Sequence, residues 1–451
     1  MGDGPCITFS EKLKKVDSFA HLFPLYEVFM KINVKHLPYE KVIDLPRPPH
    51  KRPLRPNLFF RCLIRVLSIP ALWKAKFSYT TERMDQAGDG PWLILMNHSC
   101  FLDLKIAYKI FFPKPFCVVS TTDGFVGIPW LMRWIGCIPT QKFVSDLTLI
   151  RDILNAVKTK NTSVLMYPEA GYSFDGTATP LPRKLGVLLK KLDVPVVSVI
   201  TQGAFHRDPL YNCLQKRKVK VSATVKCLLT QEEIRQKSVE ELDQILDEAF
   251  TFDSFKWQQK NNIKIDEPFR ADGLHRILYQ CPHCGVEGQM EGKGIHLTCH
   301  ACGKKYELTP YGKLSALEGE TEFDHIPDWY QWQRQQVKQQ IESGEYSLDT
   351  PVKIGVLVDH KALYMVGDGR LVHNADGFTL TGCDGKLNYS QPPITSYTLN
   401  ADYYWYEIGD IISIGDRNTL YYCFPQDPKV SVTKARLATE ELYKMTTLKK
   451  Q

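Results

Sequence analysis

The chain has 451 residues, of which 43% are hydrophobic and 24% charged, a balance that is ordinary for a globular protein and predicts about three domains. Its thirteen cysteines are scattered rather than arranged as a disulfide scaffold, and no secretory signal opens the chain, so we expect a reducing, cytoplasmic setting. No window holds the roughly 18 uncharged apolar residues typical of a membrane-spanning helix, so we expect a soluble or peripheral protein.

The net charge of +7 resides in the first part of the chain, because residues 1–80 carry fourteen Lys and Arg against six Asp and Glu. We expect this basic region to be helical, with a proline-rich break. In the apolar segment 58–69, Arg61, Arg65 and Ser68 recur at helical spacing as a narrow polar stripe. Such a helix can lie in a membrane interface with its cations near anionic headgroups. A helix packed on the next domain, with solvated arginines, is the alternative.

Residues 81–232 alternate strand-like apolar runs with helical stretches, which predicts an α/β domain, a mixed sheet flanked by helices. The first run leads directly into Asn97-His98-Ser99-Cys100-Phe101-Leu102-Asp103. A neutral imidazole can take the proton of an attacking hydroxyl near pH 7, and a carboxylate on its far nitrogen fixes the tautomer. His98 and Asp103 would point apart on one regular helix, so we expect His98 in the preceding turn, with Ser99 as N-cap. A capped helix that merely contains both residues is the alternative.

Two later blocks give this motif a context. The apolar run 163–166 ends in Tyr167-Pro168-Glu169-Ala170-Gly171, and residues 194–199 read Val-Pro-Val-Val-Ser-Val. Together with the His98 motif, these blocks resemble the glycerolipid (lysophosphatidic-acid) acyltransferase family over about residues 85–230. The resemblance implies that His98 is the general base and Asp103 its orienting partner.

The resemblance also implies an acceptor site, in which Glu169 positions the acceptor and residues 127–141 form a binding block around Gly136. Here the sequence departs from the family pattern. The family usually follows Pro-Glu with Gly-Thr-Arg-Ser, whereas this chain has Ala170-Gly171-Tyr172-Ser173, so Tyr172 replaces the arginine that holds the acceptor phosphate. An arginine usually ends the acceptor block, and Gln141-Lys142 stand near that point. We expect substrate contacts from Glu169, Gly171, Tyr172, Ser173, Gly136 and Lys142, with Arg183 and Lys184 as further candidates for the missing charge.

A helical connector is expected at residues 233–275, followed by a zinc ribbon at residues 276–312. Two C-x2-C pairs, fourteen residues apart, predict a closed, structural Zn²⁺ site with four thiolate ligands: Cys281, Cys284, Cys299 and Cys302. A redox dithiol is the less favoured alternative. Nucleic acid is not an expected partner, because Lys293 is the only cation between the pairs and Glu287 and Glu291 oppose it.

The sequence pattern changes in the last part of the chain. We expect a linker helix at residues 325–345, beginning at Asp328, and a mainly-β domain at residues 350–451. Asp-Gly pairs punctuate its short β-rich runs, and a helix closes it. This arrangement looks like a pleckstrin-homology or GRAM-like module.

These features predict an O-acyltransferase that is peripheral at the cytosolic face of a membrane. It would move a fatty acyl group from acyl-CoA or acyl-carrier protein to the hydroxyl of a lysophospholipid or glycerol-phosphate-type acceptor. Cys100 as a nucleophile is disfavoured, since reactive cysteines need an electropositive site. A catalytically degenerate, lipid-binding scaffold is the alternative.

Overall fold

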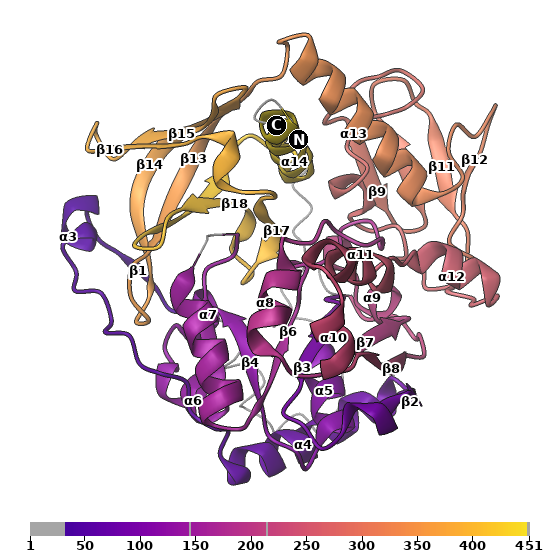
Figure 1. Cartoon of the computed structure of the whole chain (residues 1–451). Helices are drawn as coiled ribbons and strands as arrows, with labels where there is room; N and C mark the ends of the chain where they lie inside the picture. The colour runs from indigo at the N-terminus through magenta and orange to yellow at the C-terminus, as the bar shows by residue number, and fades with distance from the viewer. Residues whose placement is uncertain (1–31, 144–145, 213–214, 449–451) are drawn as a thin grey trace, which may run out of the picture.

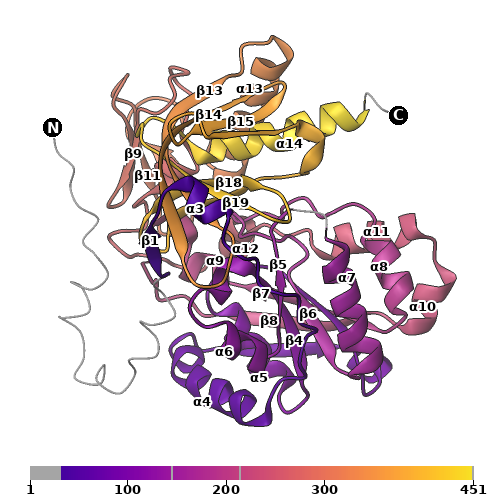
Figure 2. The ribbon, with the colours of Figure 1, turned by 90° about the vertical axis from the view of Figure 1, so that its left-hand side faces the viewer.

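The computed structural model describes residues 32–143, 146–212 and 215–448 and shows two lobes (Figures 1 and 2). We call residues 58–260 the α/β lobe and residues 261–448 the C-terminal lobe. Residues 1–31 of the basic region predicted at residues 1–80 lie outside the described residues.

The α/β lobe is built on a seven-stranded sheet with the order β2-β8-β7-β3-β6-β4-β5. Only β7 and β8 pair antiparallel within this sheet, so the sheet is mixed, as predicted. Its strands are β2 (Ser78–Glu82), β3 (Leu93–Met96), β4 (Phe116–Thr121), β5 (Cys137–Thr140), β6 (Ser163–Met166), β7 (Val196–Gln202) and β8 (Ser222–Leu229).

Helices cover both faces of this sheet (Figure 2). Ile94 and Met96 of β3 pack with α4 and α5, whereas Leu93 and Leu95 pack on the opposite face with α7, α8 and α11. Burial of both faces is typical of parallel strands and explains why β3 is apolar throughout. The helices are α4 (Leu58–Lys74), α5 (Asp103–Phe111), α6 (Pro129–Trp134), α7 (Leu147–Leu154), α8 (Leu185–Leu192), α9 (Ala204–Arg207), α10 (Gln231–Gln236), α11 (Val239–Ala249) and α12 (Ser254–Lys260).

Helix α4 is present but turned the other way from our expectation. Ser68 is 1% exposed and donates to the carbonyl of Ile64, and Arg61 donates to the carbonyl of Pro113, so this polar face packs on the lobe. The outward face is apolar. The reason is that Ser68 is bound within the helix and Arg61 Nη1 by a carbonyl of the lobe, so the polar pattern did not mark the solvent side. None of the helices among the described residues is long and apolar enough to span a bilayer.

The C-terminal lobe contains two sheets and two long helices. The ribbon is antiparallel, with the order β12-β11-β10-β9: β9 (Met290–Lys293), β10 (His296–Cys299), β11 (Lys305–Leu308) and β12 (Leu314–Ala316). Helix α13 (Ile326–Glu342) follows, with His325 rather than the expected Asp328 at its N-cap. Residues of the ribbon, α13, the large sheet and the last helix share one apolar core, which also includes Phe174, Phe205 and Phe255 of the α/β lobe. The domain boundaries expected from the sequence stay predictions.

The large sheet has the order β16-β15-β14-β13-β19-β18-β17. This order places β13, the first of these strands along the chain, beside β19, the last. The long helix α14 (Val432–Leu448) packs against it (Figure 1). Its strands are β13 (Leu348–Leu357), β14 (Leu363–Asn374), β15 (Gly377–Gly382), β16 (Leu387–Gln391), β17 (Asn400–Trp405), β18 (Gly409–Gly415) and β19 (Leu420–Pro425).

The N-terminal region contributes to this sheet, although we expected it to be helical. Strand β1 (Val34–His36) pairs in parallel with the start of β14, and the short helix α3 (Tyr39–Ile43) follows. The two lobes also meet directly: the amide of Gly127 donates to the carbonyl of His360 at 2.8 Å, and Val126 packs with Trp405 and Phe424.

Candidate active site and metal centre

The His98 motif lies in the turn that links β3 to α5. His98 Nδ1 is 2.9 Å from Asp103 Oδ2, and the amides of Ser99 and Cys100 donate to the same oxygen at 2.8 and 3.1 Å. Asp103 is 1% exposed and begins α5. A carboxylate that already accepts two amides makes Nδ1 the protonated nitrogen, which leaves Nε2 as the acceptor.

The turn is fixed by Asn97 rather than by the predicted Ser99 cap. Leu102 is the N-cap of α5 and makes no side-chain cap bond. The hydroxyl of Ser99 accepts from Asn97 Nδ2 at 3.2 Å, and Asn97 Oδ1 accepts from the amide and hydroxyl of Thr201 in β7. Our sequence analysis missed this role of Asn97, whose partner lies on a strand far along the chain.

Two tyrosines stack on the two faces of the His98 ring. Tyr167 lies at a centroid distance of 4.0 Å and Tyr172 at 3.9 Å, both close to parallel. The His98 side chain is 19% exposed. Burial lowers the pKa of His98, and the hydrogen bond to Asp103 acts in the opposite direction. The imidazole is therefore kept in its neutral form, which a general base requires.

Glu169 holds two loops of this site. It is fully buried; Oε2 accepts from the amide of His98 at 3.1 Å, and Oε1 accepts from the amide of Thr179 at 3.0 Å. Burial raises the pKa of Glu169 to about 7, against the hydrogen bonds from Thr179 and His98. Both oxygens accept from backbone amides, so Glu169 fixes the backbone at His98; its contact with an acceptor stays a prediction.

The remaining residues predicted to bind substrate fall into two groups. Gly136 and Ser173 shape the backbone: Gly136 has φ +85° beneath the ring of Pro56, where a Cβ would clash, and Ser173 Oγ donates to the carbonyl of Thr177. Lys142 and Gly171 lie near the junction of the lobes. Lys142 lines a cavity of about 20 Å³ with residues of β16, β17 and β18, and its charge lowers the pKa of His98, although less than burial does. Gly171 faces Phe143.

The Cys100 thiol is unsuited to nucleophilic chemistry. It is 2% exposed, and burial together with the Asp103 charge raises its pKa well above the ordinary value. A thiol without its thiolate does not attack an ester.

Residues 76–202 match the model of the family described as Acyltransferase. This segment is an acyltransferase domain. It contains His98, Asp103 and the loop from Tyr167 to Ser173, whereas the ribbon and the large C-terminal sheet lie beyond the match.

The other comparisons add little to this assignment. A search of curated proteins finds no match. Among solved structures, the chain is similar to the 1-acyl-sn-glycerophosphate (LPA) acyltransferase PlsC from Thermotoga maritima. The identity is 18%, the match covers 43% of this chain and 77% of that chain, and the TM-score is 0.33, a likeness that supports no argument about substrate.

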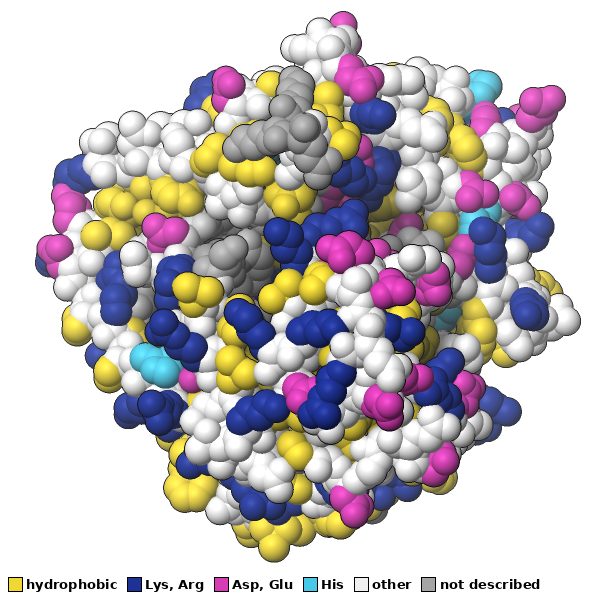
Figure 3. Space-filling model, in the orientation of Figure 1, with side chains coloured by type: hydrophobic (Ala, Val, Ile, Leu, Met, Phe, Trp, Pro, Cys, Tyr) yellow, Lys and Arg dark blue, Asp and Glu magenta, His cyan; other side chains and the backbone are white. Residues whose placement is uncertain are grey.

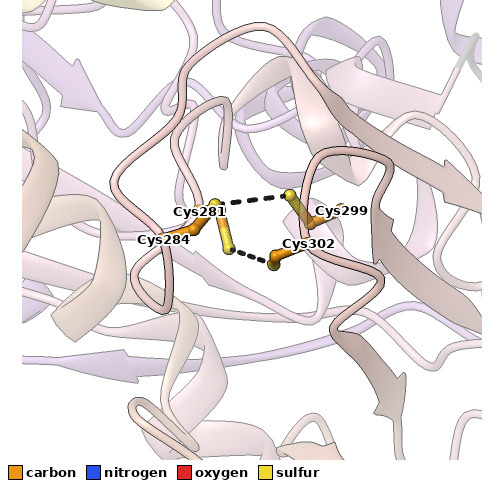
Figure 4. Close-up of side chains that lie close together, drawn as sticks. All are labelled: Cys281, Cys284, Cys299 and Cys302. Atoms are coloured by element: carbon orange, nitrogen blue, oxygen red, sulfur yellow. Dashed lines mark hydrogen bonds between the residues drawn. The ribbon is translucent and has the colours of Figure 1, made fainter.

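Beyond the acyltransferase domain, the four predicted cysteines meet between the turns of the ribbon (Figure 4). The Sγ atoms of Cys281 and Cys302, and those of Cys284 and Cys299, are 3.8 Å apart. A tetrahedral zinc ion with Zn–S bonds of about 2.3 Å has sulfur–sulfur distances of about 3.8 Å. The cluster could therefore hold a metal ion and is compatible with zinc.

The histidines near the cluster do not join it. His283 lies 3.0 Å from Glu322, and His300 lies 3.1 Å from Glu291. The ribbon is instead tied to the long helices: the indole of Trp329 in α13 donates to the carbonyl of Gln280, and Glu287 pairs with Lys434 of α14 at 2.7 Å. A metal here would stabilise the packing of the whole C-terminal lobe.

Proposed function

We propose that the protein is an O-acyltransferase that moves a fatty acyl group from a thioester, acyl-CoA or acyl-carrier protein, to the hydroxyl of a lysolipid at a membrane surface. The observation that carries this proposal is the His98–Asp103 pair inside an acyltransferase domain, with Nδ1 bound to the carboxylate at 2.9 Å.

The reaction needs one base that works twice. His98 Nε2 takes the proton of the acceptor hydroxyl while its oxygen attacks the thioester carbonyl carbon. Asp103 stabilises the imidazolium that forms. When the tetrahedral intermediate collapses, the carbon–sulfur bond breaks and the thiolate leaves. The imidazolium returns its proton to that sulfur, so an ester and a free thiol are the products.

An uncharged aromatic ring occupies the position of the family's phosphate-binding arginine. Tyr172 keeps a planar group against His98 but offers no positive charge. Lys142 is the cation whose charge reaches His98. We therefore favour a lysolipid acceptor whose phosphate is already esterified or absent over one with a terminal phosphate.

The membrane surface would be met by an apolar face formed by two helices. On α4, the outward stripe consists of Phe59, Cys62, Val66, Ile69 and Trp73, the last of which is 78% exposed. The rings of Phe60 and Trp134 lie 6.4 Å apart and connect this stripe to Trp130 and Trp134 of α6. In Figure 3, hydrophobic side chains gather along the lower edge of the molecule, where Figure 1 places α4.

Exposed cations flank α4 along the chain: Lys51, Arg52 and Arg55 before it, and Lys74 and Lys76 at its end. An apolar helix face rimmed by cations is typical of proteins that lie in the interface of an anionic membrane. This face would hold the protein where lysolipids reside, peripheral at the cytosolic side.

The C-terminal sheet supports a pleckstrin-homology or GRAM-like arrangement. Its first strand pairs with its last, its strands otherwise follow one another, and a helix closes it. Such modules often bind lipid headgroups or proteins, so this lobe would add a second membrane or partner contact.

The competing function is a lipid-binding scaffold without turnover. Two observations favour it. Tyrosine rings stack on both faces of the His98 imidazole, and the cavity that Lys142 lines has a volume of only about 20 Å³. A scaffold would bind vesicles but release no thiol from any thioester.

The deciding experiment measures free-thiol release from long-chain acyl-CoA or acyl-carrier protein with a panel of lysolipids. We expect turnover by the wild type, loss of it in His98→Ala, and full activity in the control His296→Ala, which changes a ribbon histidine. Absence of turnover with every pair, or full activity of His98→Ala, would overturn the proposal.

A further inference from the structure

The helix α14 contacts a loop of the acyltransferase domain through one side chain. We call this loop, residues 167–174, the catalytic loop. Arg436 of α14 has a side chain that is 4% exposed. Its Nη1 donates to the carbonyl of Tyr172 at 3.2 Å, and its guanidinium lies 4.4 Å from the ring centroid of Phe174. The Arg436 side chain therefore contacts the residues on both sides of Ser173.

A buried charge network fixes Arg436 in this position. Its Nε lies 3.2 Å from Glu440, which also pairs with Arg334 of α13 at 2.7 Å and accepts from the hydroxyl of Thr398 at 2.6 Å. Breaking a buried ion-pair network by removing one partner is costly, so the network sets one orientation of the guanidinium.

One backbone hydrogen bond between this loop and the turn that carries His98 is long. The amide of Ser173 donates to the carbonyl of His98 at a long distance, 3.4 Å. The ring of Tyr172 nevertheless lies flat on the imidazole at 3.9 Å, and Glu169 at the start of the same loop holds the His98 amide. A shift of the Tyr172 backbone would therefore change the setting of the base.

We propose that Arg436 is a positioning residue of the active site: it holds the Tyr172 loop against His98, so the acyltransferase domain works only with the C-terminal lobe docked. This inference rests on the proposed function and goes beyond it, because it assigns the docked C-terminal helix a part in catalysis.

The test compares two arginines of the same network. Arg436→Met removes the donor to Tyr172 but leaves Glu440 paired with Arg334. Arg334→Met leaves Glu440 paired with Arg436 and Glu441 paired with Lys444. The partners of Arg334 are Glu440 and Glu441, so this change takes no hydrogen bond from Tyr172. Both variants lose one buried cation and leave no carboxylate of the network unpaired.

We expect Arg436→Met to lower kcat by about 10- to 100-fold with little change in KM for the donor, because misplacement of a base by about 1 Å costs this much. Arg436→Lys should recover part of the loss, since it keeps a cationic donor. Arg334→Met should retain the wild-type kcat. Equal kcat in Arg436→Met and Arg334→Met would overturn the proposal.

A second readout does not depend on turnover. Diethyl pyrocarbonate acylates the exposed nitrogen of a neutral histidine, and mass spectrometry of the full-length protein's peptides gives the rate at His98. We expect faster modification in Arg436→Met than in the wild type and Arg334→Met. Unchanged modification in Arg436→Met would overturn the proposal, whereas failure of the wild type to turn over would overturn the proposed function alone.

Discussion

The imidazole of His98 lies against the phenol of Tyr172, with ring centroids 3.9 Å apart and an angle of 25° between the ring planes. In the family that the sequence resembles, an arginine usually stands at this position of the sequence motif. A tyrosine preserves the flat contact on the base and removes the charge that would bind a terminal phosphate. The acceptor preference of this protein should therefore depend on this one side chain.

Restoring the arginine tests that dependence. In Tyr172→Arg, the guanidinium can still stack on His98, and it adds a bidentate donor for phosphate. We expect KM for lysophosphatidic acid to fall about tenfold, since a charged hydrogen bond contributes roughly 1.5–3 kcal/mol. Steady-state kinetics over the acceptor panel provide the measurement. Tyr172→Phe keeps the stacked ring and should leave the acceptor order unchanged; the same gain in both variants would contradict the charge argument.

Asp103→Asn should nearly abolish turnover without unfolding the site. The asparagine oxygen can still accept from the amides of Ser99 and Cys100, but it cannot stabilise an imidazolium at His98. We expect kcat to fall by about 10⁴-fold, as for the orienting aspartate of other catalytic histidines. Glu82→Gln, which changes an exposed carboxylate on β2, is the control. Retention of more than a tenth of wild-type kcat would rule out the assigned role.

The pH profile of kcat/KM should separate the effects of burial and of Asp103 on the pKa of His98. The base must be neutral, and burial lowers its pKa, so the acidic limb of kcat/KM should lie below the ordinary histidine value of about 6.5. Asp103 opposes this shift, and Asp103→Asn should move the limb to still lower pH. A depressed pKa also means that stability linked to His98 is present above pH 6.5 and is lost as the pH falls through the folded-state pKa. A limb above pH 7 in the wild type would argue against the buried imidazole as the base.

Removal of the metal should loosen the whole C-terminal lobe. Cys281 and Cys299 belong to the same apolar core as Trp329 and the strands of the large sheet. We expect one zinc ion per chain by elemental analysis, and a loss of several kcal/mol in the free energy of unfolding for Cys281→Ser, because binding energy at such a site is folding energy. Cys62→Ser, at an exposed cysteine of α4, should change neither. A metal-free protein of full stability would refute a structural role.

Charge on the outward face of α4 should release the protein from vesicles. Val66→Glu and Trp73→Glu each place a carboxylate where an apolar side chain would enter the interface, and the loss of one such contact amounts to roughly 1.5–3 kcal/mol. We expect at least tenfold weaker binding to phosphatidylglycerol vesicles in co-sedimentation. Leu317→Glu changes an apolar residue on the C-terminal lobe that is 50% exposed, against 59% for Val66, and serves as the control. Equal binding by all variants would place the membrane contact elsewhere.

The sequence predicted the parts of the site that lie close together along the chain. His98 and Asp103 lie five positions apart, and the C-x2-C spacing of each cysteine pair can be read directly from the sequence. Side chains that join across the fold were missed: Asn97 with Thr201, and Arg436 with Tyr172. Such partners carry no local pattern. The direction of α4 was also missed, because its serine is satisfied within the helix and so does not need water.

Strand β1 has a consequence for how the protein is made. It pairs with Leu363–Met365 of β14, beyond the part of that strand that β15 covers. During synthesis, β1 leaves the ribosome long before its partner exists, and it must wait unpaired while the acyltransferase domain folds behind it. When β1 finally docks, it closes an edge that would otherwise invite pairing with another chain. Deleting this short strand should therefore promote self-association of the finished protein while leaving the catalytic groups untouched.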